Sequence, residues 1–148
     1  MRLWHYELLP YLPDRQFKGQ LRELVAIMHD WRDKGKTNHL LINRVMDYDK
    51  GHLLDYFLRY ACEYEQRFGR AISSKIFNEF FDFCNFDFAY KPVDRTFVGW
   101  HNKLYLRVCM ANLYEKCVFG RGVSRIDEME WALLCGGYEE ITGEVYFI

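Results

Sequence analysis

Hydrophobic residues recur at helical spacing over the first long segment of the chain. Five apolar residues there follow one another at steps of four, three, four and three: Phe17, Leu21, Leu24, Met28 and Trp31. Such spacing places them on one face of an amphipathic helix. Pro13 ends the segment before it, and Asp14 suits the positive end of a helix dipole. The pattern therefore predicts a helix from residue 14 to about residue 31.

The same reading predicts further helices along the rest of the chain. Asp49 caps a helix that Gly69 ends, and Ser124 opens a capping-box-like start in which Asp127 replaces the usual Glu or Gln. Gly136-Gly137 should stop that last helix at about residue 134. The expected helices cover residues 39–46, 49–68, a stretch starting at 73 or 74, 99–116 and 124–134.

Two segments break the helical period. The stretch from residue 85 to residue 97 is long for a loop in a small domain, which suggests a functional role. Tyr138 to Ile148 is rich in β-branched and aromatic residues, so it predicts a short hairpin or an irregular tail. The helix expected over residues 99–116 combines the apolar Trp100, Leu104, Val108 and Leu113 with several polar positions, and we expect it to be central. The expected fold is a single all-α domain over residues 1–148, with about five to six helices.

Composition supports one folded domain. The 148 residues are 50% hydrophobic and 18% aromatic, which argues against disorder. Because no apolar run approaches 18 residues and the chain start lacks signal-peptide features, we expect a cytoplasmic protein without a membrane partner. The five cysteines show no C-x-x-C spacing and are expected to be reduced, mostly buried thiols. A monomer is favoured.

Charge is distributed unevenly although the net charge is only −1. Residues 1–50 contain nine Lys or Arg against seven Asp or Glu (+2), and residues 51–148 contain eleven against fourteen (−3). Four cations are concentrated near the start: Arg2, Arg15, Lys18 and Arg22. This excludes a generally basic protein but predicts a small basic face of the kind that contacts phosphates. The charged run 32–38 is read either as a phosphate-contacting loop or as a solvated connector.

A second stripe of the first helix is the candidate site. It contains Arg15, Gly19, Arg22, Glu23 and Ala26, which lie at helical spacing. The small residues Gly19 and Ala26 leave space around the Glu23 carboxylate, and the two arginines place positive charge beside it. The stripe predicts a pocket for a phosphate-bearing backbone. The alternative is that Glu23 pairs with an arginine at the surface, where such pairs contribute little.

These residues resemble a known family. Arg2-Leu3 at the chain start, Pro13-Asp14, and Arg22-Glu23-Leu24 are similar to the phage-type pyrimidine-dimer DNA glycosylases, also called endonuclease V of that class. A weaker similarity runs from His101 to the segment 111–116. The resemblance implies a DNA repair enzyme, a glycosylase with coupled abasic-site lyase (strand-cleaving) activity. Its implied partner is damaged double-stranded DNA, and it implies neither metal nor cofactor.

The resemblance also implies roles for single residues. The family's nucleophile is the N-terminal amine, which here belongs to Met1, because an initiator Met before a bulky residue such as Arg2 is retained. An α-amine has a pKa of ~7.7–8.0, so part of it is neutral and nucleophilic near neutral pH. Glu23 would stabilise positive charge at C1′ of the sugar, with Arg22 beside it. The expected DNA-binding residues are Arg2, Arg15, Lys18 and His101.

The sequence departs from the family at two places. Ala26 stands where the family has a second arginine near the catalytic Glu, and nothing after Trp131 reproduces the family's aromatic C-terminal stretch. Two non-catalytic classes therefore stay open beside the enzyme. One is a nucleic-acid-binding module that keeps the fold without the chemistry, and the other is a helical protein-interaction domain that uses its surface tyrosines. The five histidines show no metal-ligand spacing and are read as hydrogen-bonding side chains.

Overall fold

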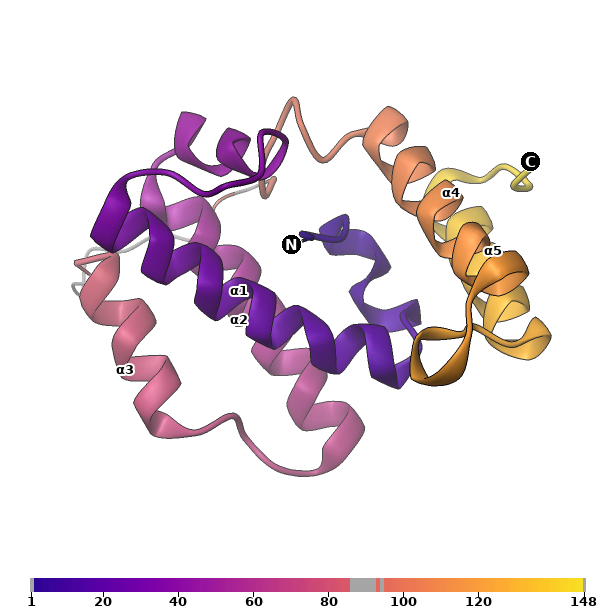
Figure 1. Cartoon of the computed structure of the whole chain (residues 1–148), viewed down its shortest axis with the longest axis horizontal. Helices are drawn as coiled ribbons and strands as arrows, with labels where there is room; N and C mark the ends of the chain where they lie inside the picture. Colours follow the sequence, from indigo (N-terminus) through magenta and orange to yellow (C-terminus); the bar gives the residue numbers. More distant parts are fainter. Residues whose placement is uncertain (1, 86–92, 94, 148) are drawn as a thin grey trace. The chain divides into compact units, whose positions relative to one another are not determined.

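The computed structural model describes residues 2–85, 93 and 95–147, and within these ranges the regular structure is entirely helical (Figure 1). The described residues form five α-helices and three short 3-10 helices, and no strand. The elements in order are η1 (Tyr6–Tyr11), α1 (Asp14–Lys34), η2 (Ile42–Asp47), α2 (Lys50–Phe68), α3 (Ser74–Phe83), α4 (Lys103–Phe119), η3 (Gly122–Ser124) and α5 (Glu128–Thr142). The prediction of an all-α fold is confirmed.

The chain forms two compact units. The first unit combines the start of the chain with Leu21–Trp100, and the second combines Trp4–Gln20 with His101–Ile148. Helix α1 therefore supplies its first two turns to the second unit and the remainder to the first. The expectation of one domain over the whole chain stays a prediction.

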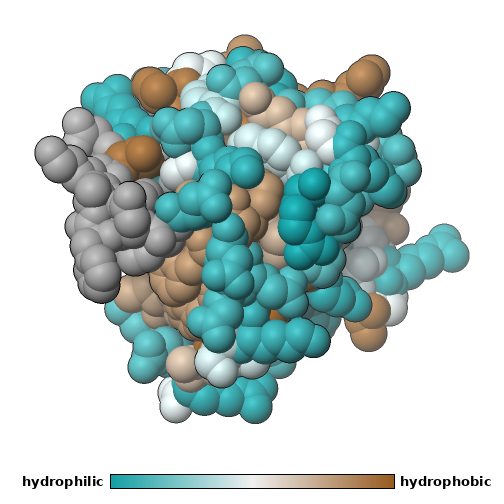
Figure 2. Space-filling view, turned by 90° about the vertical axis from the view of Figure 1, so that its left-hand side faces the viewer, coloured by the Kyte–Doolittle hydropathy of each residue, from teal (hydrophilic) through white to brown (hydrophobic). Residues whose placement is uncertain are grey.

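Aromatic packing forms the core of the first unit. The rings of Phe57 on α2 and Phe80 on α3 stack in parallel with their centres 4.0 Å apart, and Trp31 on α1 meets Phe83 edge-on at 5.4 Å. Figure 2 shows the face on which α3 lies, where hydrophobic residues reach the surface between hydrophilic ones. Phe57 and Phe80 are fully buried.

Helix α2 begins and ends at the predicted residues. The Asp49 side chain accepts a hydrogen bond from the Gly51 N–H at 2.8 Å, and Gly69 adopts the left-handed conformation that ends helices (φ 66°). The short helix expected over residues 39–46 is instead the 3-10 helix η2, which begins three residues later.

A tight turn over residues 95–100 ends the first unit. Phe97 is fully buried at a positive φ of 52°, and its N–H donates to Nδ1 of His52 at 2.9 Å. Buried Asp55 accepts hydrogen bonds from the Thr96 hydroxyl and from Arg59 Nε. This turn cannot be helical, so the predicted helix start at Gly99 is wrong. The 85–97 loop falls largely on residues 86–92 and 94, which lie outside the described residues.

Helix α4 begins at Lys103, where the Asn102 side chain accepts from the Tyr105 N–H at 2.9 Å. Two of the apolar residues on this helix, Leu104 and Val108, are 72% and 42% exposed. The buried face carries Leu106, Cys109, Met110 and Leu113. Apolar residues lie around most of the circumference of α4, so their spacing alone does not show which side packs against α5.

Helix α5 differs from its prediction at both ends. Asp127, not Ser124, is the N-cap, and it forms a reciprocal capping box with Glu130 three residues later. The helix continues through Gly136-Gly137 to Thr142 because Gly137 lies against the ring of Tyr11, where a Cβ would come within 2.4 Å of the ring. The Tyr11 hydroxyl donates to Glu140 at 2.9 Å. Residues 144–147 form an irregular tail.

The cysteines are free thiols, but the expectation that most are buried is wrong. Cys109 is buried, Cys62 is exposed, and the remaining three are half-buried. Within the described ranges, no helix is long and apolar enough to cross a bilayer.

Candidate active site and nucleic-acid interface

Glu23 lies on the part of α1 that belongs to the first unit. Its side chain is half-buried and the neighbouring Arg22 is exposed. Neighbouring positions of the helix are anchored in the core by Leu24, Ile27 and Met28, none of which has exposed surface. Because the anchored side fixes the rotation of the helix, Glu23 is held at the border between core and solvent.

The start of the chain belongs to the same unit as Glu23. Met1, the expected nucleophile, lies outside the described residues. Arg2 is exposed, whereas Leu3 is only 1% exposed. Burial of Leu3 anchors the chain two residues after the expected amine.

The next residues are held within the second unit by a pair of buried histidines. The rings of His5 and His101 stack with centres 5.1 Å apart. Nδ1 of His101 accepts a hydrogen bond from the Tyr6 N–H at 3.1 Å, and Nδ1 of His5 accepts one from the Glu7 N–H at 3.2 Å. The Trp4 N–H donates to Gln20 Oε1 at 2.8 Å. The backbone N–H groups of Trp4, Tyr6 and Glu7 are thus all bound to side chains.

Burial keeps both rings neutral. It lowers the pKa of His5 to about 4, although hydrogen bonds to backbone groups of His101 and Asn102 partly oppose this. Burial lowers the pKa of His101 well below its ordinary value, and the neighbouring His5 adds to the effect. His101 is 6% exposed and uses Nδ1 within the protein, so the structure gives it an anchoring contact. Its expected role in DNA binding stays a prediction.

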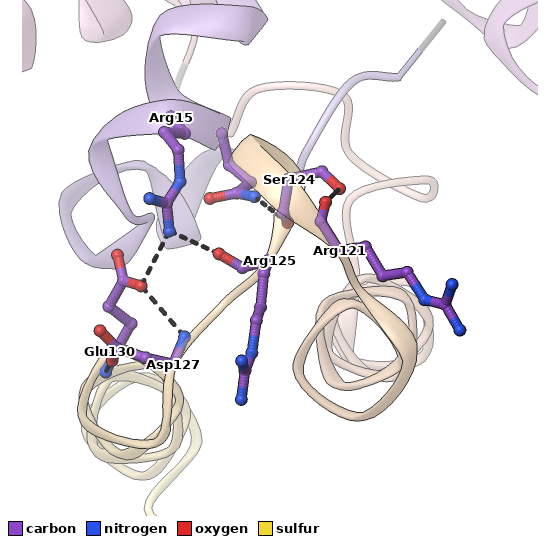
Figure 3. A network of polar contacts seen from close by, with 7 residues as sticks. Arg15, Arg121, Ser124, Arg125, Asp127 and Glu130 are labelled. Atoms are coloured by element: carbon purple, nitrogen blue, oxygen red, sulfur yellow. Dashed lines mark hydrogen bonds and ion pairs between the residues drawn. The ribbon is translucent and has the colours of Figure 1, made fainter.

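Arg15 and Lys18 lie on the first turns of α1, in the second unit, and both are exposed. Figure 3 shows that the Arg15 guanidinium is engaged. Its Nη2 donates to the backbone carbonyl of Arg125 and to Glu130 Oε1, the latter at 3.2 Å. Arg15 therefore holds the segment at Arg125 and Glu130, a structural role that the sequence did not reveal. About half of its side chain is still exposed (48%), which leaves surface for a phosphate.

The segment that Arg15 holds joins α4 to α5, and we call residues 120–127 the α4–α5 loop. Gln16 Nε2 donates to the Ser124 carbonyl at 3.0 Å, and the Ser124 hydroxyl donates to the Arg121 carbonyl at 3.1 Å. The side chains of Arg121 and Arg125 are exposed and point away from Arg15 in Figure 3. The contacts hold the backbone of the loop and present two guanidinium groups to solvent.

Arg121 and Arg125 were missed by the sequence reasoning, although a signal was present. No Asp or Glu lies between Glu115 and Asp127, while the same stretch carries three cations. A count over half of the chain hides this local excess, because the acidic residues of α5 follow directly.

The charged run 32–38 is partly neutralised by its own neighbours. Arg32 donates from Nε and Nη2 to both carboxylate oxygens of Asp33, at 2.8 and 3.1 Å. Lys34 Nζ lies 3.6 Å from Asp30. These pairs favour the connector reading for the first half of the run. Among the described residues, no cluster of three or more His, Cys, Asp or Glu side chains could hold a metal ion.

Comparison with known proteins identifies the family. The model of the pyrimidine dimer DNA glycosylase family matches residues 1–75, about half of the chain, including Glu23 and all of α1 and α2. No curated protein and no solved structure matches. The matched region includes both Met1, the expected nucleophile, and Glu23, the expected carboxylate. The chain belongs to the pyrimidine dimer DNA glycosylase family.

Proposed function

We propose that the protein is a DNA glycosylase with coupled abasic-site lyase activity on pyrimidine-dimer-type damage. The observation that carries the proposal is the family match, which starts at residue 1 and includes Glu23. The proposal assigns the nucleophile to the α-amine of Met1 and charge stabilisation to Glu23. The chain start and Glu23 both belong to the first unit, which is consistent with this assignment.

The proposed reaction conserves atoms and charge at each step. The neutral amine nitrogen attacks C1′ of the damaged nucleotide, and the glycosidic bond breaks as the base leaves C1′ with the bonding electron pair and accepts a proton. The nitrogen lone pair then opens the sugar ring by breaking the C1′–O4′ bond, O4′ takes up a proton from solvent, and a protonated Schiff base forms between the amine and C1′. Loss of a proton from C2′ and departure of the 3′ phosphate cleave the strand, and water then releases the sugar from the amine.

Glu23 acts on the charge that develops in the first step. As C1′ loses the base, the sugar becomes positively charged, and a carboxylate at the edge of the core stabilises that charge more strongly than one in bulk water. The half-buried position of Glu23 suits this task. Arg22, exposed next to it, would bind a phosphate beside the reacting sugar.

Phosphate binding in the proposal comes from exposed cations in both units. Arg2 belongs to the first unit, and Arg15, Lys18, Arg121 and Arg125 belong to the second. His101 would contribute by holding the Tyr6 amide and with it the start of the chain. Reaching C1′ in a duplex requires local opening, which costs a few kcal/mol and costs least at a lesion that already weakens stacking.

Blocking the amine tests the proposal. One added residue moves the amine by up to ~3.6 Å, and a displacement of about an ångström can lower a rate on the order of a hundredfold. A protein with an uncleaved N-terminal residue, or with an acetylated amine, should fail to nick ultraviolet-irradiated plasmid. Its melting temperature should match that of the native chain. Nicking at the native rate by the blocked protein would refute the amine mechanism.

A DNA-binding module without chemistry is the second candidate. Ala26, in place of the family's second arginine, is the observation that favours it. Such a module would bind damaged duplex with the salt dependence of a few phosphate contacts and would leave irradiated plasmid intact. The unblocked native protein in the nicking assay separates the two functions directly.

A further inference from the structure

Two adjacent leucines project from the first unit. Leu40 is 91% exposed and Leu41 is 48% exposed, in the loop between α1 and η2. Among the described residues of the first unit, the other large hydrophobic side chain with comparable exposure is Val98. Single exposed apolar residues need no explanation, but a nearly fully exposed leucine beside a second one at a loop tip indicates a contact surface.

Hydrogen bonds within the loop keep these leucines in solvent. We call residues 35–44 the leucine loop. Buried Thr37 donates from its N–H and its hydroxyl to Asn43 Oδ1, at 2.7 and 2.8 Å, and its hydroxyl oxygen accepts from the His39 N–H at 3.1 Å. The Asn43 N–H donates back to the His39 carbonyl at 3.1 Å. These hydrogen bonds therefore join the residues before the two leucines to Asn43, which follows them.

The residues that follow Leu41 anchor the tip of the loop from behind. Ile42 is 2% exposed and Val45 has no exposed surface, so both face the core of the first unit. The Arg44 N–H donates to the Leu41 carbonyl at 3.2 Å. Because the neighbouring apolar side chains are buried while Leu40 and Leu41 are not, the exposure of the pair is set by the loop and not by general disorder of the segment.

Positive charge surrounds the apolar tip. No Asp or Glu lies between Asp33 and Asp47, while Lys34, Lys36 and Arg44 are cationic, and Lys36 and Arg44 are exposed. The guanidinium carbon of Arg44 lies 5.9 Å from the centre of the Trp100 ring, which holds it on one side of the loop. A chain with net charge −1 thus carries its two exposed leucines in a stretch that has three cations and no acidic residue.

We propose that the leucine loop is a DNA-intercalating wedge. Leu40 and Leu41 enter between two base pairs of the duplex, and Lys36 and Arg44 bind the flanking phosphates. Apolar side chains with a basic surround are the groups that proteins insert to unstack and kink DNA. The inference rests on the proposed DNA substrate and adds to it the residues that bend the duplex.

The position of the wedge follows from α1. Eleven residues separate Glu23 from Lys34 on this helix, which is a rise of roughly 16 Å. At 3.4 Å per base step, that distance corresponds to about five base pairs if α1 follows the duplex. The wedge therefore acts on the flank of the lesion and bends the DNA there, which eases opening at the damaged nucleotide.

A fluorescence experiment with the full chain tests the wedge. Duplexes carry a tetrahydrofuran abasic analogue, with 2-aminopurine placed at successive positions on either side. The native protein should raise the 2-aminopurine signal at a flanking step a few base pairs from the analogue. The double variant Leu40→Ala/Leu41→Ala should lose this signal and bind about tenfold more weakly. Met at both positions should restore the signal.

Two further variants separate the parts of the proposal. Leu104→Ala/Leu133→Ala removes two leucines of the second unit that are 72% and 62% exposed, and it should leave the signal and the affinity unchanged. Lys36→Ala should weaken binding and reduce the salt slope by about one, the value for one phosphate contact. The alanine substitutions at the two loop leucines should not lower the melting temperature.

Other results would overturn the wedge. A double alanine variant that unstacks 2-aminopurine as the native chain does would show that the leucines do not insert. Binding of the native protein to phosphatidylserine vesicles that is lost in this variant, with DNA behaviour unchanged, would assign the loop to a membrane surface. Fluorescence without nicking of irradiated plasmid would keep the wedge and refute the glycosylase, whereas nicking without fluorescence would do the reverse.

Discussion

The first unit carries a half-buried carboxylate, Glu23, and two projecting leucines, whereas the second unit carries arginines on a loop held in place by its backbone. Charge is used differently in the two. In the first unit, Glu23 lies where core and solvent meet, so its electrostatic effect is strong over a short range. In the second, Arg121 and Arg125 are exposed to solvent, so each contributes a weaker, salt-sensitive attraction.

The comparison suggests that the chemistry resides in the first unit alone, whereas the second unit contributes attachment to DNA without taking part in the reaction. Helix α1 belongs to both, with Arg15 near its start and Glu23 two turns later. If this division holds, only variants in the first unit should change the reaction rate, and variants in the second should change affinity or stability.

The largest expected effect is that of Glu23→Gln. The substitution keeps the volume and removes the charge, so strand cleavage should fall by about 10²–10³-fold, the usual loss for one electrostatic stabiliser. DNA binding should be retained or strengthened, since repulsion of phosphate is relieved. Single-turnover cleavage and gel-shift titrations measure both.

The matched control is Glu65→Gln, which makes the same change at an exposed residue of α2 in the first unit. It should cleave and bind as the native chain does. Equal loss of activity in the two variants would contradict a specific role for Glu23, and unfolding of the Glu23 variant would make that residue structural.

Acid should destabilise the second unit through the buried histidines. The pKa of His5 is about 4 in the folded protein, below the ordinary 6.5 of an exposed histidine. The neutral ring therefore contributes its full share to the free energy of unfolding above pH 6.5, and this share is lost as the pH falls towards 4. The loss should reach roughly 3 kcal/mol at the acid end, measured by urea unfolding at several pH values.

Two histidine variants sharpen this result. His5→Asn keeps an acceptor for the Glu7 amide and removes the titrating ring, so its stability should vary less between pH 6.5 and 4. His39→Asn, at an exposed histidine, should retain the native pH dependence. A native protein whose stability is flat across this window would contradict the assignment of neutral, buried rings.

Adjacent glycines in α5 provide a matched pair within the second unit. Gly137→Ala would push a methyl group into the Tyr11 ring and should lower stability by about 1–2 kcal/mol after the gain in helix propensity. Gly136→Ala meets open space and should raise stability by up to about 1 kcal/mol. Thermal melts of both variants test whether η1 rests on α5 through this residue. Equal shifts in the two variants would argue against it.

The double variant Arg121→Ala/Arg125→Ala should change DNA binding without changing the reaction. Loss of two phosphate contacts should reduce the slope of log affinity against log salt concentration by about two. Binding of the variant should be about tenfold weaker than that of the native chain at low to moderate salt. The cleavage rate at saturating DNA should not change. Arg70→Ala, at an exposed arginine of the first unit, is the control. A lower cleavage rate of the double variant at saturating DNA would contradict the claim that the second unit takes no part in the reaction.

Local signals predicted much of the fold. Asp49 and Gly69 define α2 because a cap acts within one turn of the helix end. The same rules failed where a distant residue decided the outcome. Gly136-Gly137 does not stop α5, because Tyr11 packs there, and Leu104 is exposed because α5 covers another side of α4.

The candidate site shows the same limit. Glu23 and Arg22 were found from helical spacing and a family resemblance that both lie near the chain start. The engagement of Arg15 with the α4–α5 loop depends on residues 110 positions away, which no local pattern reports. Burial of His101 beside His5 also joins distant segments. Arg121 and Arg125 were accessible from sequence through the absence of nearby acids, but only with a short counting window.

The central claim is that the amine of Met1 attacks the sugar, and borohydride trapping tests it most directly. The native chain is incubated with an abasic oligonucleotide and reduced, and the adduct is digested and mapped by mass spectrometry. The proposed mechanism predicts one covalent protein–DNA adduct at the N-terminal peptide, attached through the α-amine. An adduct attached through a lysine, or no adduct under conditions in which the protein nicks the same oligonucleotide, would contradict it.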